Sequence, residues 1–219
     1  MRQERVEGYL GAIYRLRVDG EAPVPLSQLT AYFDFSPVSV HEMVLKLDAE
    51  GWVAYHPYRG VALTEAGEEV ALALLRRHRL WERFLTDILE LPWDEAHEIA
   101  GGLEHVATEK VTERLATFLG SPQACPHGGP IPPQARSKEE LCLRSVPVGA
   151  EARVSRIAPE TPERLRLAAD WLLTPGRDLK VVAQIDDATE VLVADENAEA
   201  ARPIAVPSEH AQAIWLELM

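Results

Sequence analysis

The stretch that decides the fold of this chain is residues 36–67, SPVSVHEMVLKLDAEGWVAYHPYRGVALTEAG. Its first two residues, Ser36 and Pro37, pair an N-cap with a proline at the first helical position, which predicts a helix over residues 38–50. We expect one side of this helix to face a core, and that side comprises Val40, Val44, Leu45 and Leu47. The polar side remains available for a partner.

Two alternating segments follow that helix and predict a β-hairpin. Residues 52–56 and 61–64 are joined by a turn at residues 57–60. A short helix over residues 26–33, with Ser27 as its cap, precedes the stretch. Together these elements make up a winged helix, whose second helix enters the DNA major groove. The same unit can also serve only for folding or for binding another protein.

Polar residues of the second helix and of the hairpin are the candidates for DNA contacts, because such groups hydrogen-bond phosphates and base edges. The candidates are Ser36, Pro37, Ser39, His41, Glu42, Lys46, Tyr58 and Arg59. The formal net charge of −13 argues against a nucleic-acid partner, because DNA binding draws on excess lysine and arginine. A locally basic face or bound cations can overcome this objection.

A second informative stretch is residues 76–105, RRHRLWERFLTDILELPWDEAHEIAGGLEH. His78 and Glu82 stand four residues apart, so on a helix they share one face. A break at residues 91–92 allows a second helix, with His97, to face the first. Further candidate metal ligands follow His97 in the sequence: Glu98, Glu104 and His105. Imidazoles and carboxylates without a nearby thiolate favour Mn(II), Fe(II), Co(II), Ni(II) or Zn(II). We expect a metal site between two helices; the alternative is an ordinary solvated pair.

The helices around this stretch carry more apolar residues than one small domain needs. A long helix is expected over residues 68–89, capped at residues 64–67, with two more over residues 93–119. Their apolar surface either forms an ordinary core or is buried between two copies of the chain in a symmetric dimer. Residues 121–140 predict a linker, in which Cys125-Pro126-His127 is a metal ligand pair or a proline-fixed turn. We favour the turn.

The sequence changes after Cys142 to short β-like runs separated by turn signals. The runs at residues 152–158, 179–185, 188–195 and 203–207 predict a small barrel. Further helices are expected over residues 162–173 and, at the end of the chain, over residues 208–218. Four parts are therefore expected: a winged-helix domain over 1–70, a helical metal-binding and dimerisation domain over 71–122, a proline-rich linker over 123–144 and a barrel domain over 145–219.

Composition favours a soluble protein of the cytoplasm. Of the 219 residues, 47% are apolar, which is enough for a proper core. No apolar run approaches the length of a membrane span, and the N-terminus lacks the apolar stretch of a signal peptide. The cysteines, Cys125 and Cys142, are too few for a disulfide framework and are expected to be reduced thiols.

Together these stretches resemble the diphtheria-toxin-repressor family of iron- and manganese-dependent transcriptional regulators over essentially the whole chain. The resemblance is carried by residues 36–67, by RRHRLWERFL and HEIAGGLEH in the metal region, and by CPHGGPIP in the linker. It implies a mainly α protein with α+β parts: an N-terminal winged helix-turn-helix, a helical dimerisation domain and a C-terminal SH3-like β-barrel. It also implies a homodimer that binds a palindromic DNA operator when Mn(II) or Fe(II) is bound.

The family has an ancillary and a primary metal site, and this chain is similar to the ancillary one. His78, Glu82 and His97 match it residue by residue. In the family a residue of the SH3-like domain completes this site. Glu160 or Glu163 is the candidate for that place here.

The primary site departs from the family pattern. Glu104 and His105 match it, but its other ligand positions hold Gly8, Gly11 and Gly101, which have no side chain to bind a metal. Either the ancillary site has become the main sensor, which we favour, or a second site is rebuilt from Glu7, Glu98, Glu104 and His105. The absence of the family's cysteine leaves a hard carboxylate set, which favours Mn(II) over Fe(II).

We therefore expect a metal-dependent transcriptional regulator that is not an enzyme, binds double-stranded DNA as a homodimer and has no membrane partner. A metal ion that joins the helix of His78 and Glu82 to the helix of His97 would fix the distance between the two winged helices of a dimer on DNA. One alternative is a winged-helix regulator that senses a small molecule through the linker and barrel. Another is a metalloenzyme that uses His78, Glu82 and His97, although an obvious general base is missing.

Overall fold

The computed structural model of the chain describes residues 3–17, 23–134, 139–193 and 203–219. The chain divides into two compact units, one of Met1–Arg77 with Glu104–Ala107 and one of His78–Leu103 with Thr108–Met219. The four-part division expected from sequence stays a prediction, and the end of the expected strand over residues 188–195 lies outside the described residues. Within the described ranges, we find no helix long and apolar enough to cross a membrane.

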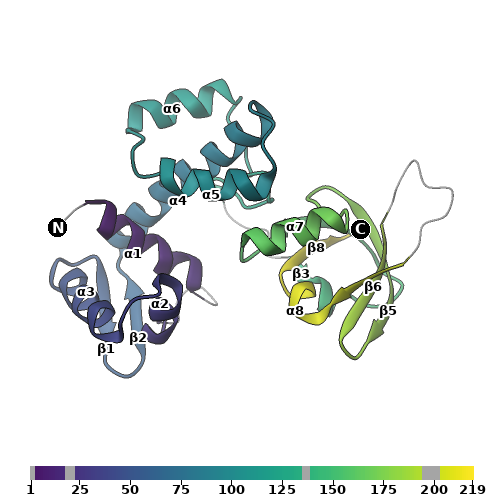
Figure 1. The fold of residues 1–219 in the computed structure, drawn as a ribbon, viewed down its shortest axis with the longest axis horizontal. Coiled ribbons are helices and arrows are strands. Elements are labelled where there is room, and N and C mark those ends of the chain that lie inside the picture. Colours follow the sequence, from purple (N-terminus) through teal and green to yellow (C-terminus); the bar gives the residue numbers. More distant parts are fainter. Residues whose placement is uncertain (1–2, 18–22, 135–138, 194–202) are drawn as a thin grey trace. The chain divides into compact units, whose positions relative to one another are not determined.

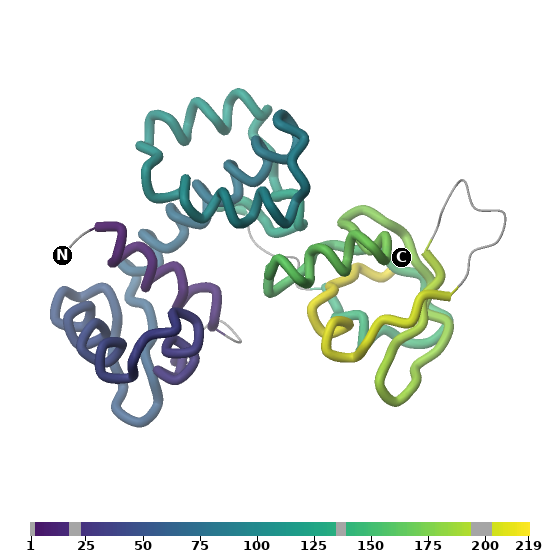
Figure 2. The backbone as a smooth tube through the Cα atoms, in the orientation of Figure 1, coloured from purple at the N-terminus to yellow at the C-terminus, as the bar shows by residue number. Residues whose placement is uncertain are grey.

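The first unit is a winged helix (Figures 1 and 2). Its elements are helices α1 (Gln3–Leu16), α2 (Leu26–Phe33) and α3 (Pro37–Ala49), strands β1 (Val53–His56) and β2 (Gly60–Leu63), and the first part of helix α4 (Glu65–Asp87). The strands form an antiparallel hairpin in which Tyr55 pairs with Val61. Leu10 of α1, Leu47 of α3 and Val61 of β2 share one buried core, which confirms the predicted winged helix.

The start of α3 is capped as predicted, and the start of α2 is not. The Ser36 Oγ atom accepts a hydrogen bond from the backbone N–H of Ser39 at 3.2 Å. The prediction of Ser27 as a cap is wrong, because Pro25 precedes α2 and Ser27 lies within it.

The buried side of α3 also differs from the prediction. Leu45 is 43% exposed, so the prediction of a core position is wrong there. Positions three and four residues apart share a helix face, and Met43 therefore takes its place beside Val40 and Leu47. Leu45 lies on the exposed side of this helix instead.

The second unit begins within α4 and contains helices α5 (Trp93–Leu103) and α6 (Glu109–Phe118). Helix α4 starts at Glu65 rather than at the predicted Glu68, because Thr64 Oγ1 accepts a hydrogen bond from the Gly67 N–H at 3.2 Å and caps the first turn. Apolar clusters hold the three helices together: Leu80 packs with Leu115 and Ala116, and Leu85 packs with Ala96 and Ala100.

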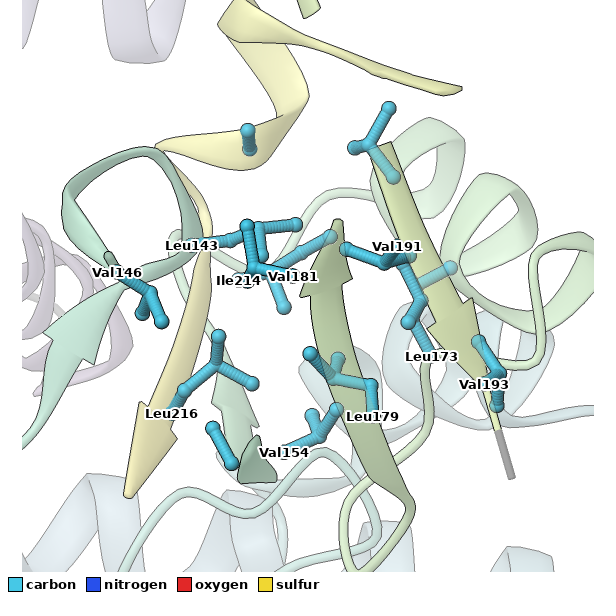
Figure 3. Close-up of a cluster of buried hydrophobic side chains, with 14 of the residues drawn as sticks. Leu143, Val146, Val154, Leu173, Leu179, Val181, Val191, Val193, Ile214 and Leu216 are labelled. Atoms are coloured by element: carbon cyan, nitrogen blue, oxygen red, sulfur yellow. The ribbon is translucent and has the colours of Figure 1, made fainter. Parts of the chain in front are cut away.

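The rest of the second unit is a six-stranded antiparallel sheet, consistent with the predicted SH3-like barrel. Its strands are β3 (Leu141–Cys142), β4 (Glu151–Ile157), β5 (Asp178–Ile185), β6 (Ala188–Val193), β7 (Ile204–Pro207) and β8 (Ile214–Leu218), in the order β3-β8-β4-β5-β6-β7. A 3-10 turn, η1 (Leu143–Ser145), and helices α7 (Pro162–Asp170) and α8 (Ser208–Ala211) join them. Figure 3 shows side chains such as Val154, Val181 and Leu216 converging on one core.

The final helix predicted over residues 208–218 is wrong. Helix α8 ends at Ala211, and strand β8 follows. Burial alternates along this strand, because Ile214 and Leu216 enter the core while Trp215 lies beneath the Arg156 guanidinium at 4.4 Å. Pairing with the neighbouring strands β3 and β4 decides its structure, and such distant pairing overrides local helix propensity.

Candidate metal centre

Helix α4 brings two predicted ligands together. His78 and Glu82 lie one turn apart, and His78 Nε2 is 2.9 Å from Glu82 Oε1. Both side chains are buried, and Glu82 is fully excluded from solvent. A carboxylate charge in such a place requires compensation by opposite charge or by hydrogen bonds.

Helix α5 adds the third predicted ligand, His97. Its Nδ1 atom is 2.7 Å from Glu82 Oε1 and 3.2 Å from His78 Nε2. The packing of Leu85 against Ala96 holds the two helices at this point. The structure therefore brings His78, Glu82 and His97 together, as their spacing and the turn between the helices suggest.

A third imidazole comes from the proline-rich loop, for which the sequence predicts a turn. The turn exists, because the Gly128 N–H donates to the carbonyl of Cys125 at 3.0 Å and Gly128 has a φ of +84°. It also directs His127 inward, where this fully buried side chain places Nδ1 at 3.2 Å from Glu82 Oε1. The sequence treats a turn and a ligand position as alternatives, but the loop forms the turn and also places His127 beside Glu82.

The surroundings of His127 fix which of its nitrogens faces the cluster. Its Nε2 atom lies 3.0 Å from the carbonyl oxygen of Trp93, which can only accept a hydrogen bond. In the neutral ring Nε2 therefore carries the proton, so the Nδ1 lone pair is the one available to a metal ion. In the protonated ring the Nδ1–H donates to Glu82. The loop is also anchored to the barrel, because the His127 carbonyl accepts from the Ile157 N–H at 2.9 Å.

Glu160, in the segment between β4 and α7, completes the group. One ligand atom from each of Glu82, His97, His127 and Glu160 lies within 4.8 Å of all the others. Of the two carboxylates considered for this place, Glu163 lies exposed in the first turn of α7 and outside the group. The Arg79 guanidinium stands 3.8 Å from Glu160, and this contact limits where that carboxylate can lie.

The electrostatics of the cluster follow from its burial. Burial raises the pKa of Glu82, but the charge and hydrogen bonds of His78 and His127 outweigh it and hold that pKa well below its usual range. Burial conversely lowers the pKa of His127, and the Glu82 carboxylate more than compensates, so that pKa is raised. The buried carboxylate therefore stays ionised and attracts positive charge to this point.

Two features show that the cluster suits a divalent cation. Three imidazole nitrogens lie within 3.2 Å of the single atom Glu82 Oε1, so four atoms that can donate to a metal ion lie close to one point. In the described part of the chain, the other oxygen, Glu82 Oε2, is buried without a hydrogen-bond partner. Imidazoles and carboxylates arranged in this way are the donor set of a first-row divalent metal.

One expectation about this site requires correction. Sequence analysis placed no thiolate near the metal, but the Cys125 Sγ atom lies 3.9 Å from Glu160 Oε1 and 3.8 Å from His127 Nδ1. Burial, and then the nearby carboxylates, raise the pKa of this thiol well above its usual range. Without a metal ion this thiol is therefore protonated, and Cys125 lies outside the group of converging donors, which are nitrogen and oxygen atoms.

Other residues proposed from sequence lie outside this group. Glu104 and His105 belong to the first unit, where they contact Arg15 and Glu7. Glu98 lies exposed on α5. The Gly8 and Gly101 positions are open, because an added Cβ atom would meet nothing within 4 Å.

The predicted DNA contacts lie on α3 and on the hairpin of the first unit. All of them are exposed except His41, which is half-buried against the Tyr55 ring. Tyr58 stands fully in solvent at the hairpin turn, with Arg59 beside it. The Ser36 hydroxyl is already used to cap α3, so its part in any DNA contact is shared with that structural role.

Comparisons with known proteins agree with this architecture. Residues 1–61 match the N-terminal DNA-binding domain of the iron-dependent repressors, and residues 64–133 match their metal-binding and dimerisation domain. The iron-dependent repressor IdeR of Mycobacterium tuberculosis is 32% identical over 187 residues, covering 82% of this chain and 80% of that protein.

Solved structures extend the similarity to the whole chain. A manganese-dependent transcriptional repressor in complex with manganese has a TM-score of 0.88 and 30% identity, covering 98% of this chain and 100% of that one. The repressor ScaR with bound Zn²⁺ has a TM-score of 0.81 and 28% identity, covering 98% and 99%. These relatives are repressors rather than enzymes, which argues against the metalloenzyme alternative. The chain therefore belongs to the iron-dependent repressor family, whose members include the diphtheria toxin repressors.

Proposed function

We propose that this metal-dependent DNA-binding transcriptional regulator senses its cation through Glu82, His97, His127 and Glu160, with His78 adjoining them. The observation that carries the proposal is the convergence of these donors from α4, α5, the proline-rich loop and the segment before α7. A divalent cation, when bound, supplies the positive charge that the buried Glu82 carboxylate and the half-buried Glu160 carboxylate attract. The protein's own part is to hold four separate segments around one point.

Mn(II) is the expected ion, and Fe(II) is the second choice. Carboxylate and imidazole donors suit both, and Cys125, the nearby soft donor, lies outside the converging group. The similarity to a manganese-dependent repressor supports Mn(II) as the first choice. The similarity to the mycobacterial iron-dependent repressor supports Fe(II) as the second.

The DNA partner is a palindromic operator bound by a homodimer. Two winged helices related by two-fold symmetry meet two half-sites, which then form an inverted repeat. The exposed apolar residues of the helical region suit burial between two copies, and they include Ile88, Leu89, Ile99, Val111 and Phe118. Sedimentation tests this surface: Phe118→Asp should yield monomers that still bind Mn(II). Because it acts on DNA, we expect the protein to work in the cytoplasm.

DNA selection tests the proposed function without knowledge of the operator. Duplexes enriched by the Mn(II)-loaded protein from a random pool should contain an inverted repeat. Their affinity should fall at least tenfold in excess chelator, and His127→Ala should remove this difference. Equal affinity with Mn(II) and with chelator would eliminate metal sensing. Calorimetry without Mn(II) binding at micromolar concentrations would instead favour the regulator that senses a small molecule.

A further inference from the structure

A second buried group of charged side chains lies in the first unit, and the proposed metal site does not use it. It joins α1, the first part of α4 and the segment Glu104–Ala107. Glu7 of α1 is 5% exposed, and Glu104 is 4% exposed. Two buried carboxylates in one place are costly unless opposite charges pair with them.

Arg77 of α4 meets both other segments. Its Nη2 atom lies 3.0 Å from Glu7 Oε1, and its Nε–H donates to the backbone carbonyl of Glu104 at 2.8 Å. One guanidinium thus connects α1, α4 and the segment that follows α5. The planar fork of arginine suits such a bridge, because its donors point in fixed, divergent directions.

Arg15 of α1 provides the second positive charge. Its Nη2 atom lies 3.3 Å from Glu104 Oε2. Two guanidiniums therefore face two buried carboxylates. Since arginine is always protonated in proteins, these positive charges do not depend on the concentration of any metal ion.

The orientation of His105 argues against a shared metal ion at this place. Its Nδ1 atom is 3.2 Å from Glu7 Oε2, whereas its Nε2 atom is 3.5 Å from Glu104 Oε1. The two nitrogens of one imidazole point away from each other, so these carboxylates lie on different sides of the ring. In contrast to the donors around Glu82, the three side chains do not converge on one point.

We propose that Arg15 and Arg77 are built-in cations that fasten α1 to α4 and to Glu104–Ala107, so that the DNA-binding unit keeps its structure without metal. The inference rests on the proposed function only in assigning the metal response to the second unit. Metal binding then acts on α5 and the proline-rich loop, while the first unit is held by charges that the chain itself carries.

Hydrogen exchange of the full-length protein tests this directly, with Mn(II) or a chelator present. Exchange in residues 3–16 should be equal in both conditions, whereas Mn(II) should slow exchange in residues 93–103 and 123–131. The same comparison in His127→Ala separates the two proposals. If Mn(II) still slows exchange in residues 3–16 of that variant, an ion binds the first unit and the inference is overturned. If Mn(II) affects neither segment of the wild type, the proposed metal site fails while the inference stands.

Substitution of Arg77 provides the second test. In chelator, Arg77→Met should accelerate exchange in residues 3–16 roughly tenfold or more, because it removes the guanidinium from the buried Glu7 carboxylate and leaves that group with the Gln3 amide and the His105 ring. Adding Glu7→Gln should restore most of the protection. Arg5→Met, an exposed arginine of the same helix, is the matched control and should leave exchange unchanged.

The double variant also decides the outcome if Arg77→Met alone does not fold. A folded, protected Glu7→Gln/Arg77→Met protein supports the ion-pair lock. A double variant no better protected than the single one overturns it, as does wild-type exchange in Arg77→Met.

Discussion

The two buried histidine and carboxylate clusters of this chain contain similar side chains but differ in direction and in charge. Around Glu82, imidazole nitrogens from three segments approach one carboxylate oxygen within 3.2 Å. Around His105, the carboxylates of Glu7 and Glu104 lie at opposite ring nitrogens, and guanidiniums occupy the remaining directions. Donor type alone therefore does not define a metal site, because the donors must also converge on one point.

The largest expected effect is the loss of the central carboxylate. Glu82→Gln should reduce the Mn(II) affinity more than about a hundredfold, because it removes the charge that gathers the imidazoles. Calorimetry measures the change, with the exposed Glu98→Gln of α5 as the matched control. A wild-type affinity in Glu82→Gln would mean that the ion binds elsewhere.

Metal removal should show which of the two clusters is responsible for the stability that Mn(II) binding adds. At a free Mn(II) concentration of about 100 times Kd, binding adds roughly 2.7 kcal/mol to the free energy of unfolding. Denaturant titrations with Mn(II) and with chelator should show this gain in the wild type and in Glu7→Gln, but not in His97→Ala. The account is contradicted if Glu7→Gln loses the gain.

Substitutions at two glycines of α1 test the packing around the charged cluster of the first unit. A Cβ atom at Gly8 meets nothing within 4 Å, so Gly8→Ala should stabilise the helix by about 0.5 to 1 kcal/mol. At Gly11 the Cβ atom would lie 2.9 Å from Leu74 Cδ2 and 3.1 Å from Arg15 Nη1, so Gly11→Ala should destabilise by about 1 kcal/mol. Chemical denaturation in chelator measures both, and effects of equal sign would refute the packing described for α1.

The smallest effect is expected at the thiol beside the metal cluster. Cys125→Ser should change the Mn(II) affinity less than about threefold, because Cys125 lies outside the converging donors and a soft thiol contributes little to the binding of a hard ion. Competition of Mn(II) with a fluorescent chelator measures this. A tenfold loss would make Cys125 a ligand and would turn the site toward softer metals.

Local rules were sufficient for much of the fold. The cap at Ser36, the hairpin and the helical spacing of His78 and Glu82 each depend on residues close in sequence, and the structure contains all three. They failed for β8, since its state is decided by pairing with β4, about sixty residues away by the chain.

Residue spacing predicted the candidate site only where its residues share one helix or neighbouring helices, and Glu160 was a candidate through the family resemblance alone. His127 arrives through a proline-rich turn and Glu160 through the segment before α7, and neither position follows from periodicity. The contacts of Arg77 could not be predicted from spacing either. Arg77 belongs to the cluster around His105, whereas its neighbour His78 belongs to the cluster around Glu82. Residues adjacent in sequence point in different directions on a helix, so only the packed structure assigns each to its group.

A crystal soaked in Mn(II), with anomalous diffraction recorded at the manganese edge, tests the central claim most directly. We expect a strong anomalous peak among Glu82, His97, His127 and Glu160, and no peak between Glu7 and Glu104. A peak beside His105 with none at Glu82 would contradict the account.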